Sequence, residues 1–372
     1  MRFNRICAAL VAIVGAAFQV ASAAGGYHLL QTVAVIPGDG KWDYVSVDGV
    51  NRRVYCSHGN ETVVLDADSG KVVGKIPAPR SDPSIGLAEP GRTTPFMGSH
   101  YVAIASDLGR GFTANGRAGT STIFDLKTLK QLGEVRLTGK DPNAIVYDAA
   151  THRVFAFNEA SNNASVIDAK DGKVVATIAL DGRPAFAASD DKGHLFVNLI
   201  DKGVVLRIDS RTLTAKERWP VSACGGPYNE TMAIDKKNER LFVGCRPDYR
   251  QMLAPPGPRP NRVMAILDAN DGRVITTVPI GGNPDQADFD PGTGLVFSAN
   301  GEGTVTVIKE DSPDRFSILE TVTTEPGAAR LAVDPKTHKL FVPNADLDAA
   351  PSPTEDSPPS RTRNFRVLIL GM

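Results

Sequence analysis

The sequence predicts an all-β fold, a seven-bladed β-propeller with four antiparallel strands in each blade. Three observations predict it: a pattern that returns seven times, a hydrophobic period of two residues within each copy, and complementary incomplete copies at the two ends. One copy of this size cannot bury its own apolar faces, so neighbouring copies must stack into a continuous core. The repeats therefore decide the architecture before any single motif is considered.

An aspartate that closes an apolar run sets the register of the repeat. The clearest positions, which are 59, 43, 41 and 59 residues apart, are Asp66, Asp125, Asp168, Asp209 and Asp268. Within each copy, turn pairs such as Asp-Gly separate four short alternating runs, which is typical of strands joined by hairpins. A linear β-solenoid is the alternative, but its coils are usually shorter and lack the hairpin turns.

The two ends of the repeat region complete each other. The seventh copy, over 331–344 and 365–371, contains only three strands, and segment 29–35 has no earlier partner. That segment is similar to outer strands such as 173–178. Placing it on the last blade closes the ring and removes exposed strand edges. We therefore expect the N-terminal strand to close the last blade.

Residues 1–23 have the pattern of a signal peptide. Two arginines precede an apolar stretch over 6–20, and 21–23 reads Ala-Ser-Ala, a small-x-small cleavage site. No later segment approaches the roughly 18 apolar residues that a membrane span needs. We expect a periplasmic or secreted protein whose mature part, 24–372, is one propeller domain without a membrane span. An uncleaved anchor is the alternative.

The composition of the chain indicates which classes of partner to expect. The net charge is −1 and the basic residues are scattered, so we expect no nucleic acid partner. With 35 glycines and 26 prolines the chain needs many turns, while 42% apolar residues exclude disorder. We expect a monomer.

The cysteines are consistent with an oxidising compartment. Cys7 lies in the signal peptide, which leaves three. Cys224 precedes an inner strand and Cys245 ends the strand expected beside it, so a Cys224–Cys245 disulfide is one interpretation and free thiols are the other. Cys56 alternates into a strand and reads as a small core residue.

Six segments carry motifs that identify a family resemblance: 42–44, 53–59, 102–105, 109–116, 122–129 and 297–304. With them the chain resembles the YVTN-repeat β-propellers, and its exported YncE-like branch over essentially the whole mature chain. The resemblance implies the fold and export, and says little about activity. The chain departs from the branch at Tyr101 and in the longer segment 84–99.

Three enlarged segments, 79–99, 247–261 and 345–363, are expected on one face of the propeller. Loops from an outer strand to the next inner strand share a face with the loops that join the two middle strands. Long irregular loops in a compact fold are often functional. We therefore place the functional face here.

The histidines fall into two groups. His152, His194 and His338 are expected at one repeat position on the opposite face, which indicates turn packing. His58 and His100 depart from this pattern and belong to the enlarged face, so both are expected to lean toward the central channel. A hydrogen-bonded structural histidine is the alternative for each.

Residues that enter the inner strands should surround the mouth of the channel, with Phe186 and Gln286 among them. Mixed polar groups with a few aromatic rings suit a pocket for a small ligand. The candidate ligand-binding residues are Asp43, Tyr44, His58, His100, Asn115, Asn143, Asn229, Glu230, Asp285 and Arg330. The sequence identifies no cofactor and no definite metal site.

These observations predict an exported propeller that binds a small molecule or a protein partner at the channel face without catalysis. The alternative is a metal-assisted enzyme of the lactonase or lyase type, with His58, His100, Glu230 and Asp285 as candidates. A weaker alternative is an accessory subunit of a periplasmic dehydrogenase, since related propellers occur there. No serine-hydrolase elbow, zincin motif or P-loop is present.

Overall fold

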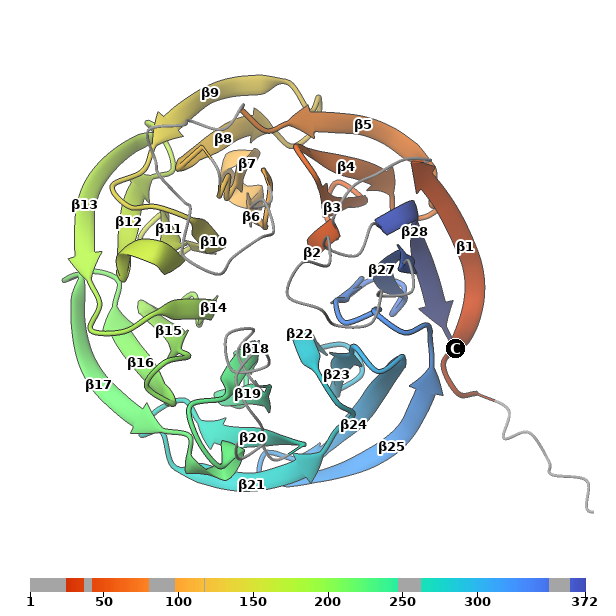
Figure 1. Cartoon of the computed structure of the whole chain (residues 1–372). Helices are drawn as coiled ribbons and strands as arrows, with labels where there is room; N and C mark the ends of the chain where they lie inside the picture. Colours follow the sequence, from red (N-terminus) through yellow and green to blue (C-terminus); the bar gives the residue numbers. More distant parts are fainter. Residues whose placement is uncertain (1–24, 37–41, 80–97, 117, 247–261, 348–361) are drawn as a thin grey trace, which may run out of the picture.

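The computed structural model describes residues 25–36, 42–79, 98–116, 118–246, 262–347 and 362–372. The predicted signal peptide and most of the three enlarged segments lie outside this part of the chain. The described residues form seven four-stranded antiparallel sheets around a central axis (Figure 1). The predicted fold class is confirmed.

Six blades follow one another along the chain, each running from an inner to an outer strand. They are β2 (Trp42–Asp48), β3 (Arg53–His58), β4 (Glu61–Asp66) and β5 (Val72–Pro77); β6 (Val102–Ala105), β7 (Arg110–Thr113), β8 (Thr120–Asp125) and β9 (Gln131–Arg136); β10 (Pro142–Asp148), β11 (Arg153–Asn158), β12 (Asn163–Asp168) and β13 (Lys173–Ala179); β14 (Pro184–Ser189), β15 (His194–Leu199), β16 (Val204–Asp209) and β17 (Thr214–Pro220); β18 (Asn229–Asp235), β19 (Arg240–Cys245), β20 (Val263–Asp268) and β21 (Val274–Pro279); and β22 (Pro284–Asp290), β23 (Leu295–Asn300), β24 (Thr304–Ser312) and β25 (Arg315–Thr323). The short 3-10 helices are η2 (Ser106–Leu108), η3 (Glu159–Ser161) and η4 (Ser222–Cys224).

The seventh blade joins the two ends of the propeller. Its order from the axis outwards is β26 (Ala332–Val333), β27 (Leu340–Leu347), β28 (Thr362–Gly371) and β1 (His28–Ile36). Strand β1 pairs antiparallel with β28, with Val33 opposite Val367. Closure by the N-terminal strand is therefore confirmed.

Strand composition follows position within a blade. The second strand β11, Arg153–Asn158, is buried along nearly its whole length because neighbouring blades cover both faces. The outer strand β13, Lys173–Ala179, alternates between exposed and covered residues, because one face remains in solvent. A period of two in the sequence therefore indicates an outer strand, and a continuous apolar run indicates a middle strand.

The aspartates that set the repeat register build the turns between the third and fourth strands. Asp168 Oδ1 accepts backbone N–H groups from Lys170 at 2.8 Å and Asp171 at 3.0 Å, and Gly172 follows with φ 68°. This left-handed φ favours glycine. Equivalent turns begin at Asp66, Asp125, Asp209 and Asp268.

One histidine of the predicted set lies elsewhere in the repeat. His152 and His338 both have positive φ, at 51° and 60°, just before the second strand of their blades. In the fourth blade Gly193 takes this position, with φ 112°, and His194 follows it. The expectation of one shared position was therefore wrong for His194. Its turn-packing role stands, since Nδ1 lies 2.7 Å from Asp190 Oδ2.

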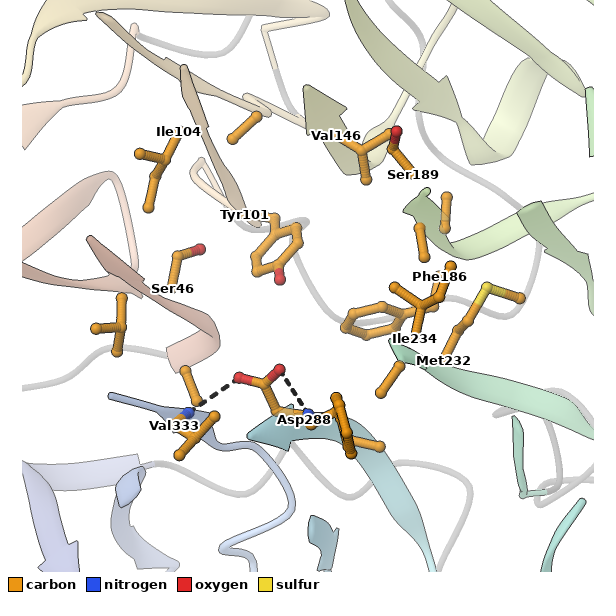
Figure 2. A pocket seen from close by; sticks show the side chains of 18 of the residues that line it. Ser46, Tyr101, Ile104, Val146, Phe186, Ser189, Met232, Ile234, Asp288 and Val333 are labelled. Atoms are coloured by element: carbon orange, nitrogen blue, oxygen red, sulfur yellow. Dashed lines mark hydrogen bonds between the residues drawn. The ribbon is translucent and has the colours of Figure 1, made fainter. Parts of the chain in front are cut away.

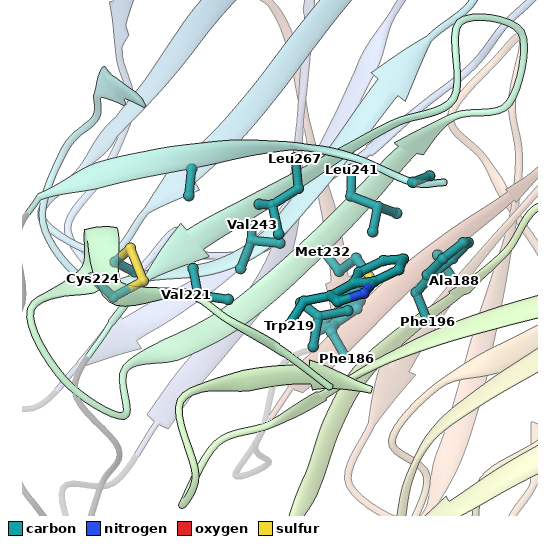
Figure 3. Packing of buried hydrophobic residues seen from close by; sticks show 14 of the residues in the cluster. Phe186, Ala188, Phe196, Trp219, Val221, Cys224, Met232, Leu241, Val243 and Leu267 are labelled. Atoms are coloured by element: carbon teal, nitrogen blue, oxygen red, sulfur yellow. A yellow bond between two sulfur atoms is a disulfide. The ribbon is translucent and has the colours of Figure 1, made fainter. Parts of the chain in front are cut away.

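The core consists of apolar clusters between adjacent blades. Figure 3 shows the cluster between the fourth and fifth blades, where the rings of Phe196 and Trp219 lie 5.7 Å apart. A Cys224–Cys245 disulfide adjoins it, with Cα atoms 5.2 Å apart, so the predicted bridge is confirmed. Cys56 is a buried free thiol, as expected. In the described part of the chain, no helix is long and apolar enough to cross a membrane.

Candidate functional site at the central channel

The inner strands bring several of the predicted residues together at one end of the channel. Asp43 and Tyr44 lie at the start of β2, and Asp285 at the start of β22. Arg330 precedes β26, and its guanidinium carbon lies 5.2 Å from the centre of the Tyr44 ring. Charged groups from neighbouring blades complete a set that we call the mouth network: Asp43, His100, Asp141, Arg246, Asp285 and Arg330.

Arg330 is the bridge of the mouth network. Its Nε lies 2.8 Å from Asp43 Oδ1, and its Nη2 lies 2.6 Å from Asp285 Oδ2. Arg246 Nη1 donates to the other oxygen of Asp285. The residues Asp43 and Asp285 are 5% and 3% exposed, and a buried carboxylate is tolerated only with charged or hydrogen-bonding partners. The two arginines supply these partners.

His100 is held between two acids. Its Nδ1 lies 2.5 Å from Asp43 Oδ2, and its Nε2 lies 3.6 Å from Asp141 Oδ1. Burial alone would lower the pKa of His100, but the close contacts with Asp141 and Asp43 and the negative charges of both acids raise it to about 10. The ring is therefore an imidazolium at neutral pH. The same ring and Arg330 hold the pKa of Asp43 below its ordinary value against the opposing effect of burial.

The acids of the mouth network are paired with cations of the protein itself. An imidazolium has no free lone pair for a cation and no capacity to act as a base. The carboxylates of Asp43 and Asp285 already neutralise two arginines and the charged His100. Within the described residues, no group of three or more His, Cys, Asp or Glu side chains could hold a metal ion.

His58 lies apart from the mouth network. It ends β3, and its ring packs at 4.5 Å from that of Phe365 in β28. Burial lowers the pKa of His58, Glu61 raises it, and Lys75 lowers it further. Neither Glu61 nor Lys75 belongs to the mouth network. His58 lies six residues after the positive-φ residue that precedes the second strand of its blade. The same slot holds Asn in four other blades, and Leu199 and Cys245 in the remaining two. His58 therefore occupies a regular position of the repeat.

Asn115 occupies the same slot and serves its own blade. Its Nδ2 donates to Thr120 Oγ1 at 3.2 Å and Thr122 Oγ1 at 3.0 Å, and its Oδ1 accepts from Thr113 at 2.8 Å. Asn300 makes the corresponding bonds in the sixth blade. The repetition assigns this side chain to the join between second and third strands.

Replacing Asn115 with alanine is expected to lower the free energy of unfolding by about 1–3 kcal/mol, because buried threonine hydroxyls lose their partner. Urea unfolding followed by tryptophan fluorescence measures the change. The matched control, Asn270→Ala in an exposed turn, should cost far less. An unchanged stability in Asn115→Ala, with loss of ligand binding, would restore Asn115 to the candidate site.

Asn229 also joins blades. Its Nδ2 donates to the backbone oxygen of Val204 at 2.8 Å and to Asn198 Oδ1 at 3.2 Å. Asn198 Nδ2 in turn donates to the backbone oxygen of Glu230 at 2.9 Å. The Asn229 amide thus links the fourth and fifth blades. The negative charge of Glu230 instead contributes to the raised pKa values of Tyr44 and Arg246.

Asn143 belongs to a second polar group at the same end of the channel. Its Nδ2 donates to Glu159 Oε2 at 2.7 Å, and Arg183 Nη1 lies 3.3 Å from Glu159 Oε1. Sequence reasoning missed Glu159 and Arg183, together with Asp141 and Arg246. Two of these, Asp141 and Arg183, directly precede the proline that opens an inner strand, and that shared position could have revealed them.

Three aromatic rings form the next layer along the channel. The rings of Tyr44, Phe186 and Tyr101 all contact one another. The ring centre of Tyr44 lies 4.6 Å from that of Phe186 and 5.6 Å from that of Tyr101, and the centres of Phe186 and Tyr101 are 5.7 Å apart. All three pairs meet edge to face, a favourable geometry for aromatic rings. The mouth network and this layer both lie at the mouth end of the channel.

Beyond the aromatic layer the channel is hollow. A cavity of about 550 Å³ is lined by residues from all seven inner strands (Figure 2). Its wall also includes the exposed turn residues Lys236, Lys237 and Pro291, which follow inner strands. The cavity therefore extends toward the face opposite to the mouth network and the predicted functional face.

Asp288 is the acid that projects into this cavity. Its carboxylate accepts backbone N–H groups from Phe289 and Val333, both at 2.9 Å, and turns toward the interior (Figure 2). Burial raises the pKa of Asp288 to about 6, the two N–H groups oppose this rise, Asp290 adds to it and Lys236 opposes it. No sequence motif marks Asp288, because its setting depends on seven strands at once.

The raised pKa predicts a pH-dependent stability difference at Asp288. The folded chain binds this proton more tightly than the unfolded chain, so stability is full below the ordinary value of 3.8 and falls as pH rises through about 6. Asp288→Asn removes this loss. We expect its melting temperature relative to the parent to increase between acidic and neutral pH. A constant difference in differential scanning calorimetry across that window would contradict the prediction.

Comparison with known proteins supports the fold alone. No family model and no curated protein sequence matches the chain. Among solved structures, it is similar to the RRP9 WD40 repeats, with 12% identity, coverage of 91% of this chain and 96% of that chain, and a TM-score of 0.66. It is also similar to a chain of a mitotic checkpoint complex, with 13% identity, coverage of 100% of this chain and 99% of that chain, and a TM-score of 0.66. The Neurospora crassa Pan2 WD40 domain matches with 13% identity, coverage of 93% of this chain and 95% of that chain, and a TM-score of 0.65.

Proposed function

We propose that the protein is an exported, periplasmic or secreted β-propeller that binds a small organic molecule in its central channel without catalysing a reaction. The cavity of about 550 Å³ carries the proposal, since ligand pockets commonly measure about 300–1,000 Å³ and are mostly apolar with a few polar groups. The wall of this site reaches the exposed turn residues Lys236, Lys237 and Pro291 on the face opposite to the mouth network. The proposed ligand therefore enters from the opposite face.

Export is supported by two independent features. The N-terminal segment has the pattern of a signal peptide, and the Cys224–Cys245 disulfide suits an oxidising compartment. The motifs that resemble the exported YncE-like propellers point the same way. Fractionation of cells that produce the full chain, with mass measurement of the mature protein, tests export directly. A cytosolic chain with an intact N-terminus would refute it.

A neutral apolar probe tests the channel. N-phenyl-1-naphthylamine, whose aryl nitrogen carries no charge at neutral pH, becomes fluorescent in apolar sites, and we expect saturable binding of one molecule per chain. Val146 lines the cavity, so Val146→Trp should fill it and abolish binding. The matched control is Val50→Trp, because Val50 is 75% exposed in a turn. Equal binding by the two variants would place the probe elsewhere and overturn the proposal.

A protein partner at the mouth face is the second candidate. Arg246 and Arg330 keep 19% and 20% of their side-chain surface exposed there, and arginine is enriched at protein interfaces. Affinity purification from the periplasmic or secreted fraction, with the parent chain and Arg246→Ala as paired baits, separates this candidate from the first. A partner retained by the parent and lost by the variant would support it. Loss of channel probe binding in that variant would instead tie Arg246 to the channel.

A further inference from the structure

We propose that the channel cavity selects an organic cation, a primary amine or alkylammonium with an apolar body, whose charged group binds Asp288. This inference rests on the proposed function, because it names the ligand class of the same cavity. It is carried by the Asp288 carboxylate, which turns into the chamber beside aliphatic and aromatic side chains of the wall.

The Asp288 carboxylate is oriented and incompletely satisfied by the protein. One oxygen accepts the N–H of Phe289 and the other the N–H of Val333. Each carboxylate oxygen can accept about two hydrogen bonds, so each retains acceptor capacity toward the cavity. An ammonium group, with donors and a positive charge, is the chemical complement of this arrangement.

The surrounding wall suits the apolar part of such a ligand. Ile104, Val146, Met232 and Ile234 line the chamber with aliphatic surface (Figure 2). Rings of Phe186 and Tyr101 contribute to the same wall, and an aromatic ring attracts an organic cation that lies near its face.

Tyr101 adds a polar contact opposite the acid. Figure 2 shows its hydroxyl directed into the cavity toward Asp288, and the Asp288 charge raises the pKa of Tyr101 in addition to the larger effect of burial. Tyr101 therefore keeps its proton at neutral pH and offers a neutral hydroxyl. Asp288 and Tyr101 together offer the ligand a negative charge and a neutral hydroxyl.

Three other charged residues near the cavity make contacts of their own. Lys236, which could attract an anion instead, donates to Asp191. Asp290 lies 2.6 Å from His338 Nδ1 through its Oδ2, and Asp235 accepts the backbone N–H of Lys237 at 2.9 Å. Asp288 is thus the acid whose remaining capacity faces the chamber, and a cation is favoured over an anion.

Competition against N-phenyl-1-naphthylamine tests this inference with three probes of similar shape. These are 2-phenylethylamine, which is a cation at neutral pH, 2-phenylethanol, which is neutral, and 3-phenylpropionate, which is an anion. We expect the amine to bind at least about tenfold more tightly than the alcohol, because a charge-assisted hydrogen bond replaces a neutral one. The anion should bind more weakly than the alcohol.

Two further measurements assign the effect to Asp288. In Asp288→Asn the advantage of the amine over the alcohol should disappear, whereas the exposed-acid control Asp181→Asn should retain it. In the parent chain, which needs no substitution, the advantage should shrink as pH falls below about 6, where Asp288 takes up a proton. This second arm decides the matter if Asp288→Asn does not fold.

The failures are distinguishable. Equal binding of amine and alcohol by the parent would overturn the cation inference and leave the channel site in place. Tightest binding of 3-phenylpropionate would show that the lysines at the rim select an anion, and would also overturn it. Absence of saturable N-phenyl-1-naphthylamine binding would overturn both the inference and the proposed function.

Discussion

Replacing Arg330 with methionine is expected to cost about 3–5 kcal/mol of folding free energy. The substitution keeps a long side chain but removes the charge that Asp43 and Asp285 share, and both carboxylates stay buried. A buried acid left without its partner costs more than the intact pair contributes. Urea unfolding, followed by the fluorescence of Trp42 and Trp219, measures the loss.

Two controls separate the buried pair from a general loss of charge. Arg218→Met breaks an exposed pair with Asp181 and should cost no more than about 1 kcal/mol. Adding Asp43→Asn and Asp285→Asn to Arg330→Met should not recover the stability, because the buried cations of His100 and Arg246 then lose the acids with which they pair. An Arg330→Met cost no larger than that of Arg218→Met would show that the mouth network contributes little to folding.

Removing the disulfide through Cys224→Ala and Cys245→Ala together is expected to lower stability by about 3 kcal/mol. The bridge closes a loop with a sequence separation of 21, which restricts the unfolded chain. Thermal unfolding without reductant compares this variant with Cys56→Ala, which removes a buried thiol that forms no bridge. If both variants lose the same stability, packing rather than the cross-link explains the effect.

The architecture could be predicted because each blade repeats the same local rules. Asp168 and its equivalents mark turns whose geometry depends on four or five neighbouring residues, so the sequence contains the whole instruction. The closure by β1 followed from counting strands. The disulfide followed from placing two cysteines on adjacent elements of one blade.

The candidate site was only partly predictable because it depends on distant segments. Inner-strand starts were correctly expected to surround the mouth, which brings Asp43, Asp285 and Arg330 together. The predicted lean of His58 toward the channel does not agree with its packing on Phe365. Aligning the second strands of the blades with one another in the sequence would have placed His58 in the asparagine slot.

The cavity escaped prediction for a different reason. Its volume depends on side chains from seven inner strands that converge on one axis, and no local pattern records their sum. One signal was present: small residues such as Ser46, Ala188 and Ala287 fall on inner strands, where larger residues would fill the channel. Small residues on the innermost strands of a propeller are therefore worth reading as the outline of a chamber.

The pairing of β1 with β28 also governs when the protein can finish folding. Val33 is made long before Val367, the residue opposite it in the seventh blade. Six blades can form as the chain emerges, but the ring stays open until the last strand arrives, and contacts this distant in sequence form slowly. Under the proposed export, this delay favours a translocation-competent form, because β1 has no partner until β28 is available.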